Sequence, residues 1–584
     1  MPTITINGVE CEFQPGQKIL EVANAHGIKI PYYCYHDALS IPAQCRICLG
    51  EIWAPNPRNE GKLEPQAGGK LQPTCSTDAA DGMVVYTNNP KAVANQKAVM
   101  EYLLINHPLD CPVCDQAGEC ELQDYSFEYG RGVSRFQETK VKQPKKDLGP
   151  NVYIYSDRCI MCTRCVRFTR EIAGTDELMI DGRGNSSQID VFPGQPLDNE
   201  LSANVIDLCP VGALLDKDFL FSQRVWFLKG TPSIDGITAS GDNITIEHNE
   251  GKIYRFKPRT NMAINTWWIT DEVRYGWKHI TENRLNSPMR RRFGALDPCS
   301  FAQAYDEALD GLKRNKDAGK KLLLMVSPML SCEDTYHLAK LATAIDPGVE
   351  FAVGYVPFRG EDKAFPKGAK PGDEGAFVMY AEKAPNARGV RRVLESFNTK
   401  AHTFEEAAER LKAGEFGAAI LTGNYPGEWA EPDFVQSLAD VFTVLIDTHP
   451  RRAMDQADIV LSGATWAEKS GSFENVNNII QAFEQAIPAG ELCKAEAQIA
   501  MDMLSLLQGE PLGPIQHEVI IVDEAPGQVP TAVEQQVQSI RLYNAANTRR
   551  EMAQSSGSLA AFTTDISLPV TETEQHASVE MVEL

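Results

Sequence analysis

The sequence has no apolar run long enough to cross a membrane. A transmembrane helix needs about 20 consecutive apolar residues, whereas the most apolar stretch of the 584 residues, 322–326, has the length of a buried strand. The start of the chain also lacks the basic segment and apolar run of a secretory signal. We therefore expect no membrane span, no export and no structural role for disulfides.

Positive charge is also scarce. The 56 Lys and Arg residues face 79 Asp and Glu residues, which leaves a net charge of −23. Such a chain repels nucleic-acid phosphates and anionic lipids, so we expect no nucleic-acid partner. No stretch matches a flavin or nicotinamide fingerprint, and we expect no substrate site and no catalytic residues. At about 150 residues per domain, the length predicts three to five domains.

Cysteine, by contrast, is plentiful and unevenly placed. Eleven of the 15 cysteines fall between residues 34 and 209. Cysteines that serve only as small buried side chains would be scattered along the chain, whereas CxxC units in a reducing compartment indicate metal ligands. The other four, which have no neighbour at ligand spacing and are interpreted as structural, are Cys11, Cys299, Cys332 and Cys493.

The first ligand set is Cys34, Cys45, Cys48 and Cys75, with gaps of ten, two and 26 residues. Three thiolates on one loop and a fourth from a later segment are typical of a [2Fe–2S] cluster. The first gap is longer than the four residues of plant-type ferredoxins. A strand–strand–helix pattern over residues 3–27 precedes the set and predicts a small β-grasp-like unit.

The second set is His107, Cys111, Cys114 and Cys120, with gaps of three, two and five residues. A [4Fe–4S] cluster needs one ligand per iron, so three cysteines leave one position for His107. A helix predicted over residues 91–106 ends just before it, because Pro108 disfavours a helical residue at 107. A histidine at such a place is often only a cap or surface residue, and its position before the cysteine loop favours ligation.

The third set is Cys159, Cys162 and Cys165, completed by Cys209 after 43 residues. The CxxCxxC triplet and the Cys-Pro ending at 209–210 match the bacterial ferredoxin pattern for a [4Fe–4S] cluster. Structural zinc also takes four Cys or His ligands and is the alternative for all three sets. Zinc sites usually pair two CxxC units, however, whereas each set here carries more ligands on one loop than on its return segment.

These motifs resemble the large iron–sulfur subunit of respiratory complex I, the proton-translocating NADH:quinone oxidoreductase, known as the G subunit in bacteria and the 75-kDa subunit in mitochondria. The resemblance is strong over residues 1–225. It rests on residues 30–36, 45–48, 75–85, 107–125 and 157–168.

The second half resembles the degenerate molybdopterin-oxidoreductase domain of that family, through residues 457–461 and 468–475. Strand-like runs at 322–326, 418–421, 441–446 and 458–461 independently predict an α/β region with a parallel sheet. Where some relatives carry a further cluster, this chain has Thr231, Ile234, Thr238 and Thr270. The resemblance therefore implies neither a fourth cluster nor a molybdopterin.

The fold class that follows is an α+β front end of ferredoxin-like modules and a degenerate α/β molybdopterin-oxidoreductase-like domain. The expected domains are a β-grasp [2Fe–2S] domain at 1–82, a His-Cys₃ [4Fe–4S] domain at 83–139, a Cys₄ [4Fe–4S] ferredoxin-like domain at 140–225, the molybdopterin-oxidoreductase-like domain at 226–521, and a weakly ordered or partner-bound tail at 522–584.

The resemblance implies an electron-relay subunit of a translocase-class oxidoreductase, with one [2Fe–2S] and two [4Fe–4S] clusters. The implied partners are a flavoprotein subunit that binds FMN and NADH, a thioredoxin-like [2Fe–2S] subunit and an eight-iron ferredoxin-like subunit. The implied place is the cytoplasmic face of the bacterial inner membrane, or the matrix side in a eukaryote. Basic residues near the cysteines are candidates for tuning the clusters; the arginines among them are Arg158, Arg164, Arg167 and Arg170.

Other redox enzymes share parts of this front end. An [FeFe] hydrogenase needs further clustered cysteines, but only three isolated ones follow Cys209. The iron–sulfur subunit of an NAD-linked hydrogenase or of a formate dehydrogenase remains the alternative. The former would be a shorter chain, and the latter would need an intact pterin site.

Overall fold

A computed structural model describes residues 1–397, 400–510 and 542–569. It divides into two compact units. Unit 1 comprises Met1–Leu228 and Phe365–Ala369, and unit 2 comprises Lys229–Ala364 and the described residues after Ala369. Within the described residues, no helix has the length and apolarity to cross a membrane.

Unit 1 opens with the hairpin that Asn7-Gly8 predicts. Strands β1 (Thr3–Ile6) and β2 (Val9–Glu12) pair antiparallel around this turn, whose residues have φ values of 52° and 89°, as a type I′ turn requires. Helix α1 (Ile19–Ala25) packs its apolar face on the sheet. The sheet order is β2-β1-β6-β3-β4, with β5 paired to β3, and the remaining strands are β3 (Leu49–Asn56), β4 (Lys62–Pro65), β5 (Gln72–Pro73) and β6 (Val84–Tyr86).

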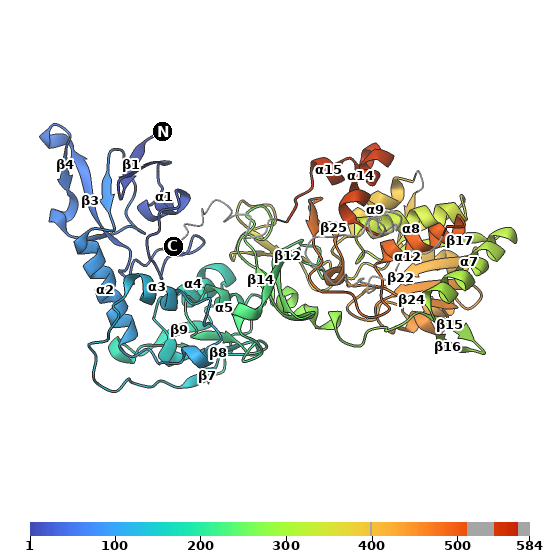
Figure 1. The fold of residues 1–584 in the computed structure, drawn as a ribbon, viewed down its shortest axis with the longest axis horizontal. Coiled ribbons are helices and arrows are strands. Elements are labelled where there is room, and N and C mark those ends of the chain that lie inside the picture. The colour runs from blue at the N-terminus through green and yellow to red at the C-terminus, as the bar shows by residue number, and fades with distance from the viewer. Residues whose placement is uncertain (398–399, 511–541, 570–584) are drawn as a thin grey trace, which may run out of the picture. The chain divides into compact units, whose positions relative to one another are not determined.

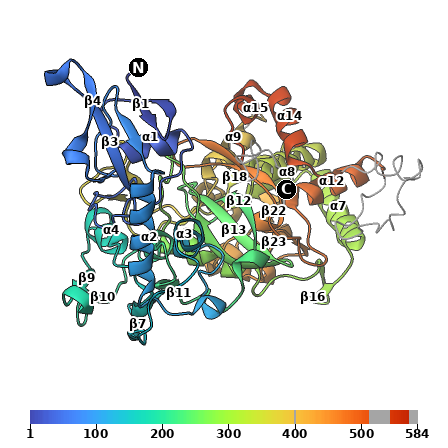
Figure 2. The same cartoon turned by 60° about the vertical axis from the view of Figure 1, so that its left-hand side comes forward.

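Short elements between cysteine loops form the rest of unit 1 (Figures 1 and 2). The predicted helix over 91–106 is α2 (Pro90–Leu104), which begins at the N-cap Asn89 and packs against β3 and α3 (Glu121–Tyr129). The other elements are α4 (Arg164–Phe168), α5 (Asn204–Leu208), the sheet of β7 (Lys145–Asp147), β8 (Val152–Tyr155) and β11 (Leu214–Asp216), and the hairpin of β9 (Leu178–Asp181) and β10 (Gln188–Val191).

Unit 2 contains the predicted parallel sheet. Its order is β16-β15-β24-β23-β22-β17-β18-β21, in which β24 through β21 run parallel and β15 and β16 form an antiparallel edge. The bounds are β15 (Met289–Arg292), β16 (Ala295–Pro298), β17 (Lys321–Val326), β18 (Glu350–Val353), β21 (Ala401–His402), β22 (Phe416–Thr422), β23 (Phe442–Asp447) and β24 (Ile459–Ser462). The four predicted strand runs all lie in this sheet.

Helices cover both faces of the parallel sheet. Leu322 and Leu324 of β17 face α7 (Phe301–Asp317), α8 (Cys332–Ile345), α9 (Ala387–Glu395) and α12 (Glu496–Leu507). Leu323 and Met325 face α10 (Phe404–Lys412) and α11 (Pro432–Gln436). This layering explains why the strands are almost continuously apolar.

Smaller elements complete unit 2. They are the antiparallel sheet of β12 (Lys229–Ile234), β13 (Asn243–Asn249) and β14 (Lys252–Pro258), the pairs β19 (Lys363–Phe365) with β20 (Phe377–Met379) and β25 (Gly471–Glu474) with β26 (Ile480–Phe483), and the helices α6 (Asp271–Tyr275), α14 (Ala545–Ser555) and α15 (Ala561–Thr564).

The tail at 522–584, which is expected to be weakly ordered or partner-bound, contains packed helices where the structure describes it. Residues 542–569 include α14 and α15, and Met552 and Phe562 are fully buried against Tyr336 and Val393. The segment is rich in polar residues, so its composition did not indicate that a few apolar side chains would be buried. Residues 522–541 and 570–584 of the tail lie outside the described residues.

Candidate metal centres

The first set gathers four cysteines from three separate segments. Cys34 follows α1, Cys45 and Cys48 precede β3, and Cys75 follows β5; all but Cys45 are buried. Hydrogen bonding from the Cys34 thiol lowers the pKa of Cys45, and hydrogen bonding from Cys75 lowers that of Cys48. Thr74 anchors the return segment, because its hydroxyl donates to the carbonyl oxygen of Cys48 at 2.9 Å. The structure therefore pairs Cys34 with Cys45 and Cys48 with Cys75, and charge interactions link the two pairs.

The third set lines one small cavity. Cys159 and Cys162 lie on the loop before α4, Cys165 lies in α4, and Cys209 caps the end of α5. All four border a small cavity of about 20 Å³, whose other lining is mainly apolar. Burial raises the pKa of Cys159 to about 12 and that of Cys162 to about 11. Thiolates here would need compensating positive charge, which the iron of a bound cluster would supply.

Unusual backbone conformations aim amide groups at these thiols. Met161 and Thr163 have φ values of 53° and 62°, in the left-handed region that a β-branched residue such as Thr163 rarely adopts. The Met161 amide lies 3.4 Å from Cys159 Sγ, and the Arg164 amide bonds Cys162 and partly offsets the rise that burial causes in its pKa. Backbone donors of this kind stabilise charge on sulfur.

The second set is more open than the other two. Cys111 is exposed, whereas Cys114 and Cys120 are buried and act electrostatically on each other and on Cys111. His107 lies in the loop after α2, and burial together with the positive charge of Arg158 lowers its pKa to about 4. Its imidazole is therefore neutral at physiological pH, the form that can bind a metal. The charged groups that act on His107 include Arg158 and Asp110, which bond each other at 2.9 Å.

The segment 209–213 borders both the second and the third set. Cys209 belongs to the third set, and the Pro210 carbonyl oxygen accepts from the Glu121 amide at 3.1 Å. A Cβ atom on Gly212 would lie only 2.2 Å from Cys114 Sγ. Sequence reasoning missed Gly212, because a glycine two residues after Cys-Pro carries no signal of what faces it.

We expect Gly212→Ala to disturb the second set selectively. Its methyl group would displace the Cys114 thiol, so the variant should lose up to four irons while the signals of the other two sets remain. Iron analysis and EPR spectroscopy of the purified chain would measure this. Gly132→Ala is the matched control, because no atom lies within 4 Å of its added Cβ. Equal iron contents in the two variants would contradict the close packing of Gly212 against Cys114.

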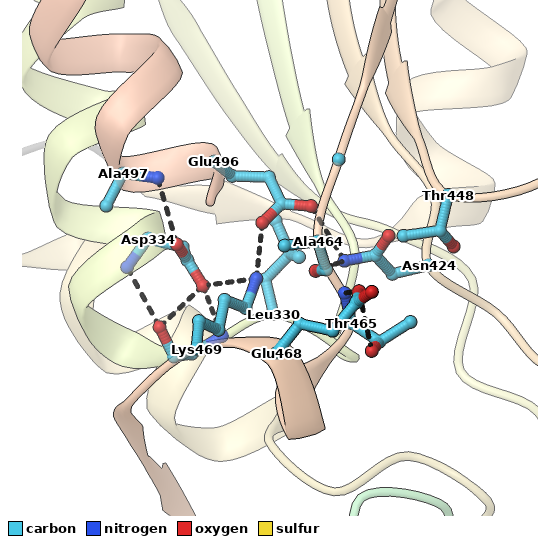
Figure 3. Close-up of polar contacts among 12 residues, drawn as sticks. Leu330, Asp334, Asn424, Thr448, Ala464, Thr465, Glu468, Lys469, Glu496 and Ala497 are labelled. Carbon is cyan, nitrogen blue, oxygen red and sulfur yellow. Dashed lines mark hydrogen bonds and ion pairs between the residues drawn. The ribbon is translucent and has the colours of Figure 1, made fainter. Parts of the chain in front are cut away.

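Unit 2 carries a buried charge network where the carboxyl ends of its parallel strands meet (Figure 3). Lys469 Nζ lies 2.9 Å from Asp334 Oδ2 and also bonds Glu496, and all three side chains are at most 2% exposed. Asn424, which follows β22, donates to Glu496 Oε1 at 2.7 Å. The Ala497 amide donates to Asp334 Oδ1 at 2.9 Å. One cation thus faces two carboxylates at the carboxyl-end edge of the sheet, the edge at which open α/β sheets bind ligands.

The acidic excess of this network predicts a pH-dependent stability. Burial raises the pKa of Glu496 from 4.5 to about 7. The folded chain therefore holds this proton more tightly than the unfolded chain, and the resulting stabilisation is lost as pH rises from about 4.5 to about 7. Glu496→Gln should flatten this part of the profile, measured by urea unfolding of unit 2 between pH 5 and pH 8. Parallel profiles for both proteins would contradict the assignment.

Family models match five stretches of the chain. They are the 2Fe-2S iron-sulfur cluster binding domain at residues 1–90, the NADH-ubiquinone oxidoreductase-G iron-sulfur binding region at 96–135, the ferredoxin-like domain of NADH-quinone oxidoreductase subunit 3 at 149–215, the NDSU1/NuoG-like 4Fe-4S domain at 228–278, and molybdopterin oxidoreductase at 366–505. The first three contain the three predicted ligand sets. The order of ferredoxin-like domains before a molybdopterin-oxidoreductase domain confirms the predicted fold class.

Curated relatives point the same way. The mitochondrial 78 kDa subunit of NADH-ubiquinone oxidoreductase from Neurospora crassa is 39% identical over 344 residues, covering 59% of this chain and 44% of that protein. The G subunit of NADH-quinone oxidoreductase from Rickettsia felis is 38% identical, covering 58% and 49%. The chain is a homologue of the large iron–sulfur subunit of complex I. It spans about half the length of the curated relatives it matches.

One further relative and one solved structure are also similar to this chain. The mitochondrial iron-sulfur protein 1 of NADH dehydrogenase [ubiquinone] from Solanum tuberosum is 35% identical over 423 residues, covering 70% of this chain and 54% of that protein. Among solved structures, an NAD⁺-reducing [NiFe]-hydrogenase chain is 27% identical, covers 38% of this chain and 91% of that chain, and has a TM-score of 0.32.

Two of the matched domains lack residues that fit their usual groups. Residues 228–278 contain no cysteine, and Thr238 there bonds Asp235 while Thr270 caps α6. Hydroxyl groups engaged in this way do not supply the thiolates of a cluster. The molybdopterin oxidoreductase match covers 366–505, where the buried Glu496 and Lys469, together with Asp334 outside the match, carry more negative than positive charge, which disfavours an anionic pterin phosphate.

Proposed function

We propose that this chain is an electron-relay subunit in the peripheral arm of a proton-translocating NADH:quinone oxidoreductase. The observation that carries the proposal is the cavity that Cys159, Cys162, Cys165 and Cys209 line together, although 43 residues separate the last two. Four convergent thiols in an apolar cavity fit a cubane cluster. When bound, such a cluster supplies reversible one-electron chemistry.

The proposal assigns three clusters to the three ligand sets. The assignments are a [2Fe–2S] cluster on Cys34, Cys45, Cys48 and Cys75, a [4Fe–4S] cluster on His107, Cys111, Cys114 and Cys120, and a [4Fe–4S] cluster on Cys159, Cys162, Cys165 and Cys209. The chain itself would supply the cysteine ligands, donate backbone amides to sulfur and exclude water from the buried sets. It would supply no substrate site.

The proposal extends to partners and location, which the named relatives support. We propose that the chain assembles with a flavoprotein subunit that binds FMN and NADH, a thioredoxin-like [2Fe–2S] subunit and an eight-iron ferredoxin-like subunit. It would lie on the cytoplasmic face of the bacterial inner membrane, or on the matrix side in a eukaryote. The names of the relatives favour this assignment over a hydrogenase or formate dehydrogenase subunit.

Freeze-quench EPR of the assembled enzyme tests the relay directly. Addition of NADH should generate the signals of all three centres within the turnover time, and excess quinone should then abolish them. A matched sample in which a quinone-site inhibitor is present should keep the signals. Signals that stay unchanged while NADH is consumed would contradict the proposed function.

His107→Cys tests the second set. Replacing a neutral imidazole by a thiolate adds negative charge to the site, so the cube should persist with a lowered reduction potential. Potentiometric EPR titration would measure the shift, with the third set as an internal reference. An unchanged potential would show that His107 is not a ligand.

A further inference from the structure

Arg167 is a buried arginine that contacts two different ligand loops. It lies in the last turn of α4, two residues after Cys165, and is only 7% exposed. Its Nη2 donates to the carbonyl oxygens of Cys34 and, at 3.4 Å, Cys162, while Nη1 donates to that of Ser40. Cys34 belongs to the first ligand set and Cys162 to the third.

Further bonds hold the same two loops together. Gln44 Nε2 donates to the Met161 carbonyl oxygen at 2.8 Å and to Thr163 Oγ1 at 3.1 Å. The Ser40 amide donates to Glu171 Oε2 at 2.8 Å, and its hydroxyl bonds the other oxygen. The contacts of Gln44 and Ser40 lie at the exposed margin between the first and third ligand loops. The Arg167 guanidinium is buried and bonds the carbonyl oxygens of ligand residues from both sets.

The neighbouring arginines make a different connection. Arg164 lies 3.5 Å from Glu121, beside Cys120, and donates to the Leu208 carbonyl oxygen at 3.4 Å. Arg158 lies 2.9 Å from Asp110 and donates to the Gly212 carbonyl oxygen at 3.4 Å. Both therefore join the second loop to the segment around Cys209, and Arg167 joins the first loop to the third.

The chemistry of the guanidinium suits this position. It is planar and rigid, stays charged in proteins and offers several donors in a fixed fork, so it can hold two carbonyl oxygens at a set separation. Its direct acceptors at the two sets are neutral carbonyl groups rather than carboxylates. Its positive charge is therefore available to offset negative charge on both ligand sets.

We propose that Arg167 is a positioning residue that fixes the first and third ligand sets relative to each other and raises the reduction potentials of both. The inference rests on the proposed function, because it assumes that both sets hold clusters. This role can be distinguished from a role in holding the fold alone. A group that acts on both sets must shift two potentials when it is removed.

The test uses the purified full-length chain and three variants. Arg167→Met removes the charge and the fork, Arg167→Lys keeps a charge but cannot reach both carbonyl oxygens, and Arg170→Met is the control. Arg170 lies on the same segment, but its side chain is 65% exposed and pairs with Asp176. The measurements are iron content, potentiometric EPR titration of each signal, and the magnetic interaction between the reduced first and third centres.

For Arg167→Met we expect full iron content and a reduction equilibrium constant about tenfold lower at both the first and third centres, which is about 59 mV for one electron. The magnetic interaction between them should also change. Arg167→Lys should shift the potentials less but change the interaction to a similar degree. Arg170→Met should match the unmodified chain in all three measurements.

Several results would overturn the inference. The inference is overturned if the Arg167→Met chain holds both the first and the third centre and the reduction potential of at most one of them has changed. If that variant loses iron, Arg167→Lys decides: an unchanged magnetic interaction overturns the inference, and a changed one supports it. Failure of the proposed function would look different, because the unmodified chain would then lack the iron–sulfur signals altogether.

Discussion

Replacing Cys162 by alanine is expected to remove one [4Fe–4S] centre and to slow NADH:quinone turnover by at least about tenfold, since changes merely next to metal ligands cost 10–100-fold. Cys162 lines the cavity with the other three thiols of the third set, and three thiolates leave one corner of the cube unligated. Reduction of ferricyanide at the flavin should continue, because that reaction does not need the downstream relay. EPR spectroscopy and the two activity assays would measure the effect.

Cys299→Ala is the matched control for this variant. Cys299 is only partly buried and has no neighbouring cysteine at ligand spacing. The control should keep all signals and both activities. If Cys162→Ala lost quinone and ferricyanide activity equally, the third set would not lie downstream of the flavin.

Replacing Lys469 by methionine is expected to destabilise unit 2 by about 3–5 kcal/mol, the usual cost of breaking a buried ion pair. The change would leave Asp334 and Glu496 without their cation in a site where all three side chains are at most 2% exposed. Chemical denaturation followed by the tryptophan fluorescence of unit 2 would measure the free energy of unfolding.

Lys400→Met provides the comparison, because Lys400 pairs with Glu406 at the surface and exposed pairs contribute little. Adding Asp334→Asn and Glu496→Gln to Lys469→Met should recover part of the lost stability, since the stranded charges are then removed. A loss no larger than that of Lys400→Met would contradict the buried network. So would a triple variant less stable than Lys469→Met alone.

Local patterns predicted much of the fold. Asn7-Gly8 predicted the first hairpin because its turn type requires positive φ at both residues. The apolar runs around Leu323 and Ile420 predicted buried parallel strands, because helices cover both faces of that sheet. Their order in the sheet was not predictable, since it depends on contacts between residues distant in sequence.

The candidate ligands could be named from spacing, but their surroundings could not. Lys469 and Glu496 look like ordinary surface residues in the sequence, and only the tertiary structure buries them together. Arg167 was one of several basic residues near the cysteines, and its bonds to Cys34 cross 133 positions. The left-handed conformations of Arg46 and Thr163 also leave no local signal, because neither residue favours positive φ.

Iron and acid-labile sulfide analysis of the purified chain, combined with reductive titration, tests the central claim most directly. Three ligand sets that hold one two-iron and two four-iron clusters predict about ten irons and three centres that each accept one electron. A colourless chain with tetrahedral zinc bound to the same cysteines would contradict the account.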